Sequence, residues 1–250
     1  RRGRVDAVFG GDCRRAALVA HRGGRWIAAW RRPRAAPTAR IRFTLAPVVA
    51  ALLMFGAAQL SIATDTITDT VRVTRNFYGL LAVTSDDADD PEQHALKLRH
   101  GGINHGWQYQ APARRLEPSA YYGPNSGIAY AFRYHPTRLR GAALRVAVIG
   151  LGTGTLAVYG RRGDEFRFYE INPDVLRLSY GADATFTFLN DTPAAVSVAL
   201  GDARLSLERE ALRGQHADFD LLAIDAFSSD SIPVHLLTRE AFEVYLDHLA

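Results

Sequence analysis

The chain has 250 residues, of which 48% are hydrophobic and 22% charged, enough for one large globular domain or for a domain with an appendage. Its single cysteine, Cys13, excludes an internal disulfide and a cysteine-rich metal site. The net charge of +4 is uneven, because residues 1–42 carry 12 Arg against two Asp, a net of +10, which leaves −6 for the other 208 residues. Since the body is mildly acidic, we predict no nucleic-acid partner.

The sequence of residues 1–63 indicates a basic tail followed by a membrane helix. Residues 1–42 are rich in Arg, Gly, Ala and Pro, and we expect a flexible segment with little stable structure. The next segment, FTLAPVVAALLMFGAAQLSIA (Phe43–Ala63), has no charge over 21 residues, and a bilayer core needs about 20. We predict a transmembrane helix here, with a buried soluble helix and an uncleaved signal as the alternatives.

Residues 66–135 predict a small β-rich domain. DTVRVTRNFYGLLAVTS combines β-branched and aromatic residues with the alternation that is typical of strands. DDADDPEQ predicts an acidic turn, and HALKLRHGGINHGWQYQ predicts a strand, a glycine turn and further extended chain. A helix is expected to begin after Ser126.

Residues 140–250 predict an α/β domain with a Rossmann-like, methyltransferase-type parallel sheet. Four strands are each followed by a helix, and the strands are LRVAVIG, EFRFYEI, AVSVALG and FDLLAIDAF. The helices are predicted over 153–160, 172–182, 202–212 and 233–250. Such tandem units build a parallel sheet with helices on both faces. A sheet of this class needs more strands, so we expect this domain to be incomplete at its C-terminus and the chain to be a fragment.

Because ligands of open parallel sheets bind beyond the carboxyl ends of the strands, the four strand ends are informative. VIGLGTGTLA follows the first strand, and Gly150, Gly152 and Gly154 would let the main chain approach a ligand. The dinucleotide pattern G-x-G-x-x-G/A fits only from Gly152 to Ala157, two residues late. The loop alone leaves an adenosyl compound, a dinucleotide and a plain tight turn open.

Acidic residues follow the other three strands. Glu170 could accept both ribose hydroxyls, or it could be a solvated acid. Asp202 could accept from an adenine amine, or it could cap the next helix. Asp225 could orient an amine and take its proton during attack on carbon. Its alternative is a Ser/Asp-rich turn before the last helix, with Asp230 or Ser231 as the cap.

Together these segments resemble the spermidine synthase family, within the class I S-adenosylmethionine-dependent methyltransferase fold. The resemblance is carried by VIGLGTGTLA, YEINPDV, LGDARLSLE and FDLLAIDAFSSDSIPVHLLTREAF, and upstream by RNFYGLLAV, LRHGGINHGWQ and PSAYYGPNSGI. It covers about residues 70–250 and looks closest to the membrane-fused branch, in which a transporter-like helical region precedes such a domain.

The resemblance implies aminopropyl transfer from decarboxylated S-adenosylmethionine to an amine, with no metal. It implies a nucleoside site made of Gly150, Gly152, Gly154, Glu170, Asp202 and Ala203. In that site the glutamate would bind ribose, and the aspartate with the alanine would bind adenine. Asp225 matches the first acid of the family's D-S-S-D-P motif and would help to deprotonate the attacking amine. Asp230 roughly corresponds to the second acid, in a loop that is two residues longer here.

The acceptor side departs from the family pattern. Thr153 stands where the family's G-G-G-D-G-G loop carries Asp, and the acid of its Y-H-E-type motif, which holds the diamine, has no counterpart in HGWQYQ or SAYYGPNSG. A dicationic diamine needs several carboxylates in place of its water. A weaker acceptor site would comprise His105, Gln108, Tyr121, Tyr122 and Asp230. As alternatives, His105 and Gln108 could satisfy a turn, and the two tyrosines could belong to the core.

We therefore expect a membrane-associated aminopropyltransferase acting on a small amine such as putrescine. The alternatives are an S-adenosylmethionine-dependent methyltransferase, a non-catalytic nucleoside-binding domain fused to a transporter, and a dehydrogenase. The basic flank would place residues 66–250 outside the cell by the positive-inside rule, whereas adenosyl nucleosides are cytoplasmic. We expect a cytoplasmic catalytic domain despite this ambiguous charge pattern. A homodimer is also compatible with the sequence.

Overall fold

The structure is a computed structural model that describes residues 17–22, 25–30, 45–226 and 232–250. The chain divides into two compact units, Arg1–Ala58 and Gln59–Ala250. In the first unit, β1 (Ala17–Arg22) and β2 (Arg25–Trp30) pair as an antiparallel hairpin. This hairpin lies in the segment where we expected little stable structure.

Helix α1 (Leu45–Thr68) covers most of the segment Phe43–Ala63, which we predicted to cross a membrane. Among the described residues, none of the helices combines the length and the apolar character that a bilayer crossing needs. The prediction of a transmembrane helix is therefore not supported. Helix α1 also extends beyond the uncharged segment into the polar sequence TDTIT.

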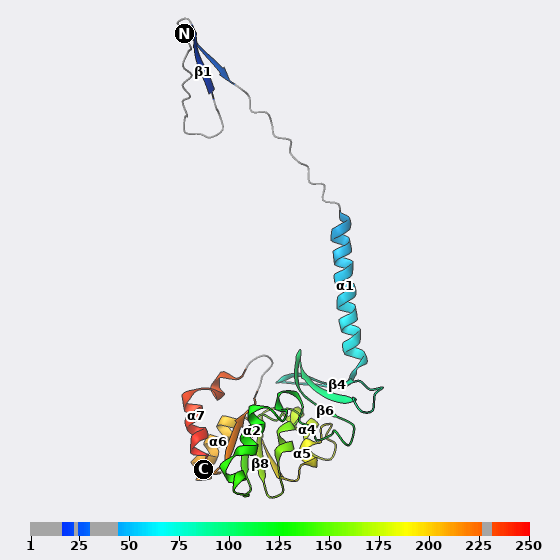
Figure 1. Cartoon of the computed structure of the whole chain (residues 1–250), viewed down its shortest axis with the longest axis vertical. Coiled ribbons are helices and arrows are strands. Elements are labelled where there is room, and N and C mark those ends of the chain that lie inside the picture. The colour runs from blue at the N-terminus through cyan, green and yellow to red at the C-terminus, as the bar shows by residue number, and fades with distance from the viewer. Residues whose placement is uncertain (1–16, 23–24, 31–44, 227–231) are drawn as a thin grey trace. The chain divides into compact units, whose positions relative to one another are not determined.

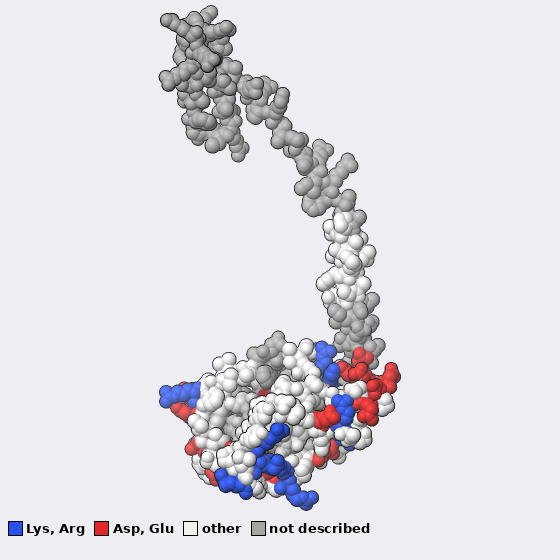
Figure 2. Space-filling model, in the orientation of Figure 1, with Lys and Arg blue, Asp and Glu red and all other residues white. Residues whose placement is uncertain are grey.

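The second unit contains a four-stranded antiparallel sheet in the order β3-β4-β5-β6, of which β4 and β6 are labelled in Figure 1. The strands are β3 (Thr70–Asn76), β4 (Gly79–Asp86), β5 (Ala95–His100) and β6 (Ile103–Tyr109). Leu81, Val83 and Leu98 are buried on its inner face, which explains the alternation in the sequence. Acidic side chains gather near β4 in Figure 2, and the connection between β4 and β5 runs from Asp87 to His94.

A helical connection leads from this sheet to the next domain. It consists of η1 (Ala120–Tyr122), α2 (Gly127–Tyr134) and α3 (Pro136–Leu139). The Ser126 hydroxyl accepts a hydrogen bond from the backbone N–H of Ala129, so α2 starts where the sequence predicted a helix.

The parallel sheet has the order β10-β7-β8-β9. Its strands are β7 (Arg145–Ile149), β8 (Glu165–Glu170), β9 (Ala195–Leu200) and β10 (Leu221–Ile224), and every pair is parallel. The predicted α/β fold with a parallel sheet is therefore confirmed. The strand order reverses between β7 and β10, and such a reversal leaves a crevice at the carboxyl ends of the strands.

The helical segments that follow the strands are mostly those predicted. They are η2 (Thr155–Tyr159), α4 (Pro173–Ser179), α5 (Phe188–Asp191), α6 (Ala203–Leu212), η3 (Val234–Leu236) and α7 (Arg239–Asp247). The helix expected over 153–160 is only a 3-10 turn. Gly154, immediately before it, is left-handed with φ +86°, and Gly160 ends it after five residues.

Both faces of the parallel sheet are covered. Val146 and Val148 pack in one cluster with Phe166, whereas Ala147 and Ile149 pack in a second cluster around α6 and α7. Alternate residues of a strand point to opposite faces, so the two clusters are the two cores of a doubly covered sheet.

Polar side chains fix the small sheet to the parallel-sheet domain. Asn76, at the end of β3, donates to the side chains of Asn172 (2.6 Å) and Asp174 (2.7 Å). Thr74 donates to the same Asp174 carboxylate at 2.8 Å. Because Asn172 is also the N-cap of α4, this contact ties the small sheet to the helix that follows β8. The two sheets can therefore line one site.

A buried ion pair holds α3 to the loop before β8. Arg138 and Asp164 have side chains only 5% and 0% exposed, and the nitrogen and oxygen approach to 2.7 Å. The Asp164 carboxylate also accepts from the backbone N–H of Leu144 and of Arg161. Burial alone would raise the pKa of Asp164, but these hydrogen bonds outweigh it and lower that pKa.

Replacing Arg138 with Met should therefore lower the free energy of unfolding by about 3 kcal/mol, because it leaves the Asp164 charge buried and uncompensated. The matched control is Arg239→Met, which breaks the exposed pair with Glu243 and should cost less than about 0.5 kcal/mol. Urea unfolding followed by circular dichroism measures both. Equal losses in the two variants would contradict the structural role of the buried pair.

Candidate functional site

One pocket lies at the carboxyl ends of the parallel strands. Its lining includes all the residues predicted for the nucleoside except Gly154, namely Gly150, Gly152, Glu170, Asp202 and Ala203. Asp225, from the end of β10, lines it as well. The small sheet closes the other side with Leu81, Leu98 and His105. The structure thus brings four strand ends that are far apart in the sequence to one cavity.

The glycines after β7 have two different roles. All three have positive φ, at +97°, +53° and +86° for Gly150, Gly152 and Gly154. A Cβ on Gly150 would lie 2.5 Å from the carbonyl oxygen of Asp225, and one on Gly152 would lie 3.2 Å from that of His105. At Gly154 a Cβ would instead meet the side chain of Leu189 at 2.1 Å. The first two glycines therefore make room beside the pocket, and the third allows packing in the core.

Thr153, the residue that departs from the spermidine synthase pattern, does not line this pocket. It is buried, and its hydroxyl lies 2.9 Å from that of Thr155. A Cβ on Gly106 of the small sheet would lie 2.6 Å from the Thr153 hydroxyl. Thr153 therefore anchors the glycine loop against β6.

Glu170 is held from behind by the main chain. Its carboxylate accepts from the backbone N–H of Leu151 at 3.0 Å and of Asn172 at 2.7 Å. Burial raises the pKa of Glu170, and the backbone hydrogen bonds oppose that shift. Since a carboxylate has about four acceptor positions, these two bonds leave capacity for hydroxyl groups in the pocket.

Asp202 is the N-cap of α6, and it also contacts a residue that the sequence did not indicate. One carboxylate oxygen accepts from the backbone N–H of Leu205 at 2.9 Å. The other lies 2.7 Å from Nε2 of His235, which also lines the pocket. Both residues border the cavity, so the capping role does not remove Asp202 from the site.

Asp225 lies under two tyrosine hydroxyls. Tyr121 donates to one oxygen at 3.1 Å, Tyr122 donates to the other, and the two hydroxyls are 3.0 Å apart. Burial raises the pKa of Asp225 to about 6, although the tyrosine hydrogen bonds oppose that shift. Burial and the neighbouring carboxylate raise the pKa of Tyr122, so its hydroxyl stays protonated. Asp225 is therefore a carboxylate whose pKa lies close to neutral pH and which accepts hydrogen bonds from two tyrosine hydroxyls.

The other residues predicted for the acceptor are placed differently. The His105 Nε2 atom is buried, with no hydrogen-bond partner among the described residues. The pKa of His105 is lowered, mainly by burial and to a smaller extent by the nearby charge of His100. Gln108 is 1% exposed, and its amide bonds to Thr187 and to the carbonyl of Arg115. Gln108 is not among the residues that line the pocket, and its role in binding the amine stays a prediction. Asp230 lies outside the described residues.

Sequence reasoning missed His235 and His100, which both line the pocket. His235 follows Pro233 in the segment PVHLLT, and its spacing from Asp202 has no regular period. His100 packs over Gly79, where a Cβ would lie 2.5 Å from its ring. Only the pairing of β4 with β5 and the packing of η3 on α6 bring these side chains to the cavity.

Comparison with known proteins supports a relationship over part of the chain. No family model matches. A polyamine aminopropyltransferase from Vibrio vulnificus (strain CMCP6) is 33% identical over 136 residues, which are 50% of this chain and 42% of that protein. The chain thus spans less than half the length of this relative. The crystal structure of human methyltransferase-like protein 13 in complex with SAH has a TM-score of 0.37 at 18% identity, covering 48% of this chain and 56% of that chain.

Gly150→Ala should weaken ligand binding in the pocket by more than the strain of a left-handed alanine can explain. A left-handed alanine costs about 1–2 kcal/mol, and here its Cβ would also clash with Asp225. Gly163→Ala is the matched control, because its φ is +94° but its Cβ would lie 3.6 Å from the nearest atom. The nucleoside 5′-methylthioadenosine serves as the probe of the pocket. Calorimetry should show that its affinity falls about tenfold or more in Gly150→Ala alone, equivalent to about 1.4 kcal/mol. Equal binding by both variants would contradict this geometry.

Proposed function

We propose that the chain is a transferase of the aminopropyltransferase type, which uses decarboxylated S-adenosylmethionine and a small amine. The observation that carries the proposal is the convergence of the glycine loop, Glu170, Asp202 and Asp225 on one pocket. The relationship to a polyamine aminopropyltransferase supports transferase chemistry over half of the chain.

The pocket fits a nucleoside donor. Glu170 ends β8, next to the glycine loop, which is where dinucleotide-binding folds place the acid that holds ribose. Asp202 and Ala203, one strand further, would hold the base. The donor's reactive carbon would then lie toward Asp225, on the far side of the glycine loop.

Asp225 would be the general base. When the amine attacks the carbon next to the sulfonium, the new C–N bond forms as the C–S bond breaks, and the electron pair stays on sulfur. The amine's proton passes to the Asp225 carboxylate, which Tyr121 and Tyr122 hold in place. A pKa of about 6 leaves this group ionised near neutrality yet more basic than an ordinary aspartate.

Methyl transfer from S-adenosylmethionine is the second candidate, and Thr153 is the observation that favours it. Where the spermidine synthase pattern has an acid at this loop position, this chain has a threonine that is buried and bonded to Thr155. The pocket then receives no charge from that position, which weakens recognition of a cationic tail. The products distinguish the two reactions.

Incubation with putrescine and decarboxylated S-adenosylmethionine should yield 5′-methylthioadenosine. Asp225→Asn should bind the nucleoside normally but lose about 100-fold or more in turnover, the usual worth of general base catalysis. Asp247→Asn, which changes an exposed aspartate outside the pocket, is the control for fold integrity. Mass spectrometry of the products and calorimetry of nucleoside binding measure these effects.

Adenosylhomocysteine formed from S-adenosylmethionine, without methylthioadenosine from the decarboxylated donor, would replace the proposal with methyl transfer. Unchanged turnover in Asp225→Asn would refute the assignment of the base. Nucleoside binding without product from any amine would identify a non-catalytic binding domain.

A further inference from the structure

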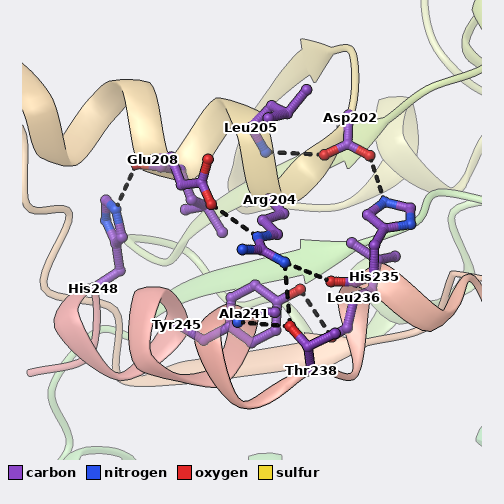
Figure 3. A network of polar contacts seen from close by, with 11 residues as sticks. Asp202, Arg204, Leu205, Glu208, His235, Leu236, Thr238, Ala241, Tyr245 and His248 are labelled. Carbon is purple, nitrogen blue, oxygen red and sulfur yellow. Dashed lines mark hydrogen bonds and ion pairs between the residues drawn. The ribbon is translucent and has the colours of Figure 1, made fainter.

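His235 and Asp202 form a polar pair in the pocket lining, and Asp202 follows β9, which lies at the opposite end of the sheet from β10 and Asp225. The side chains are 50% and 18% exposed, and the His235 Nε2 and Asp202 Oδ2 atoms are 2.7 Å apart. Figure 3 shows the His235 ring directed at the Asp202 carboxylate, which comes from the start of α6. An ionised carboxylate can only accept, so Nε2 is the donor in this contact.

The pair holds the Asp202 carboxylate at both ends. Its other oxygen accepts from the backbone N–H of Leu205 as the N-cap of α6. Each oxygen therefore has one fixed donor and keeps acceptor capacity on its remaining side. The Asp202 carboxylate can accept further hydrogen bonds from a ligand in the pocket. Its two donors restrict rotation of the carboxylate, so it cannot easily move away from a ligand atom that is also an acceptor.

The main chain around His235 is fixed as well. The Arg204 guanidinium donates to the His235 carbonyl at 3.2 Å and to the Thr238 hydroxyl at 3.2 Å, while Glu208 accepts from its Nε at 2.8 Å. The next carbonyl, that of the buried Leu236, accepts from Tyr245 at 3.1 Å (Figure 3). The main chain that carries His235 is therefore held by α6 and α7.

Apolar groups line the pocket beside this pair. They include Ile171 after β8 and Pro233 and Leu236 around η3. A flat heterocycle in contact with these side chains would present its edge to Asp202. An exocyclic amine there would donate to the carboxylate, whereas a carbonyl oxygen would face a second acceptor and be repelled.

We propose that His235 is a specificity-determining residue of this pocket. It acts through Asp202 as a positioning residue, fixing that carboxylate as an acceptor so that the site selects a 6-aminopurine nucleoside over a 6-oxopurine nucleoside. This inference rests on the proposed function, in which Asp202 faces the base of the donor.

The test compares the dissociation constants of 5′-methylthioadenosine and 5′-methylthioinosine, measured by calorimetry on the whole chain. The wild-type protein should prefer the adenine compound. His235→Phe, which keeps a ring but has no donor, should reduce that preference by about tenfold or more, as expected for a lost bond to a charged group. His235→Gln keeps an N–H donor and should retain most of the preference.

His235→Ala, which adds no bulk, should show the same loss as His235→Phe and excludes a steric cause. His216→Phe is the matched control, because that half-exposed histidine pairs with Asp247 and lines a different cavity. An unchanged preference in His235→Phe and His235→Ala would overturn the inference and leave the proposed function standing. A wild-type protein that binds neither nucleoside would overturn both.

Discussion

The close approach of Gly150 to the main chain of Asp225 is the constraint on which the site depends. A Cβ at Gly150 would lie 2.5 Å from the Asp225 carbonyl oxygen, so only glycine lets the loop after β7 pass beside the end of β10. These strands are neighbours because the sheet order reverses between them. The reversal opens the crevice, and the glycine loop leaves it wide enough for a ligand between Asp225 and Glu170.

Burial then gives the two ends of the pocket different chemistry. At one end, Asp225 is withdrawn from water under Tyr121 and Tyr122, and its pKa rises to about 6. At the other end, Asp202 is held by the N-terminus of α6 and by His235. The first arrangement suits proton transfer and the second suits recognition, because a carboxylate with fixed donors keeps a defined direction for the hydrogen bonds it accepts.

The parallel sheet was predictable because four strand-like segments are each followed by a helical segment. The same alternation of strand and helix placed Glu170, Asp202 and Asp225 at the carboxyl edge of the sheet. It could not place Tyr122 on Asp225 or His235 on Asp202, since these contacts join positions 103 and 33 residues apart. Gln108 carries a polar side chain in the predicted acceptor motif, but packing between β6 and Thr187 uses it as a structural amide. For Phe43–Ala63, the absence of charge did not by itself establish a helix that can cross a membrane.

In the proposed reaction, Asp225 accepts the proton of the attacking amine. This role can be measured through the pH dependence of methylthioadenosine formation by the wild-type protein and by Tyr122→Phe, with the exposed Tyr134→Phe as the control. Because Asp225 must be ionised to act, wild-type turnover should rise with pH through about 6. The hydrogen bond from Tyr122 lowers the pKa of Asp225, so its loss in Tyr122→Phe should raise that pKa and move the rise in turnover to higher pH. Tyr134→Phe should leave the rise at the same pH. A rise that stays at the same pH in Tyr122→Phe, or turnover that does not change across this range, would show that Asp225 is not the base.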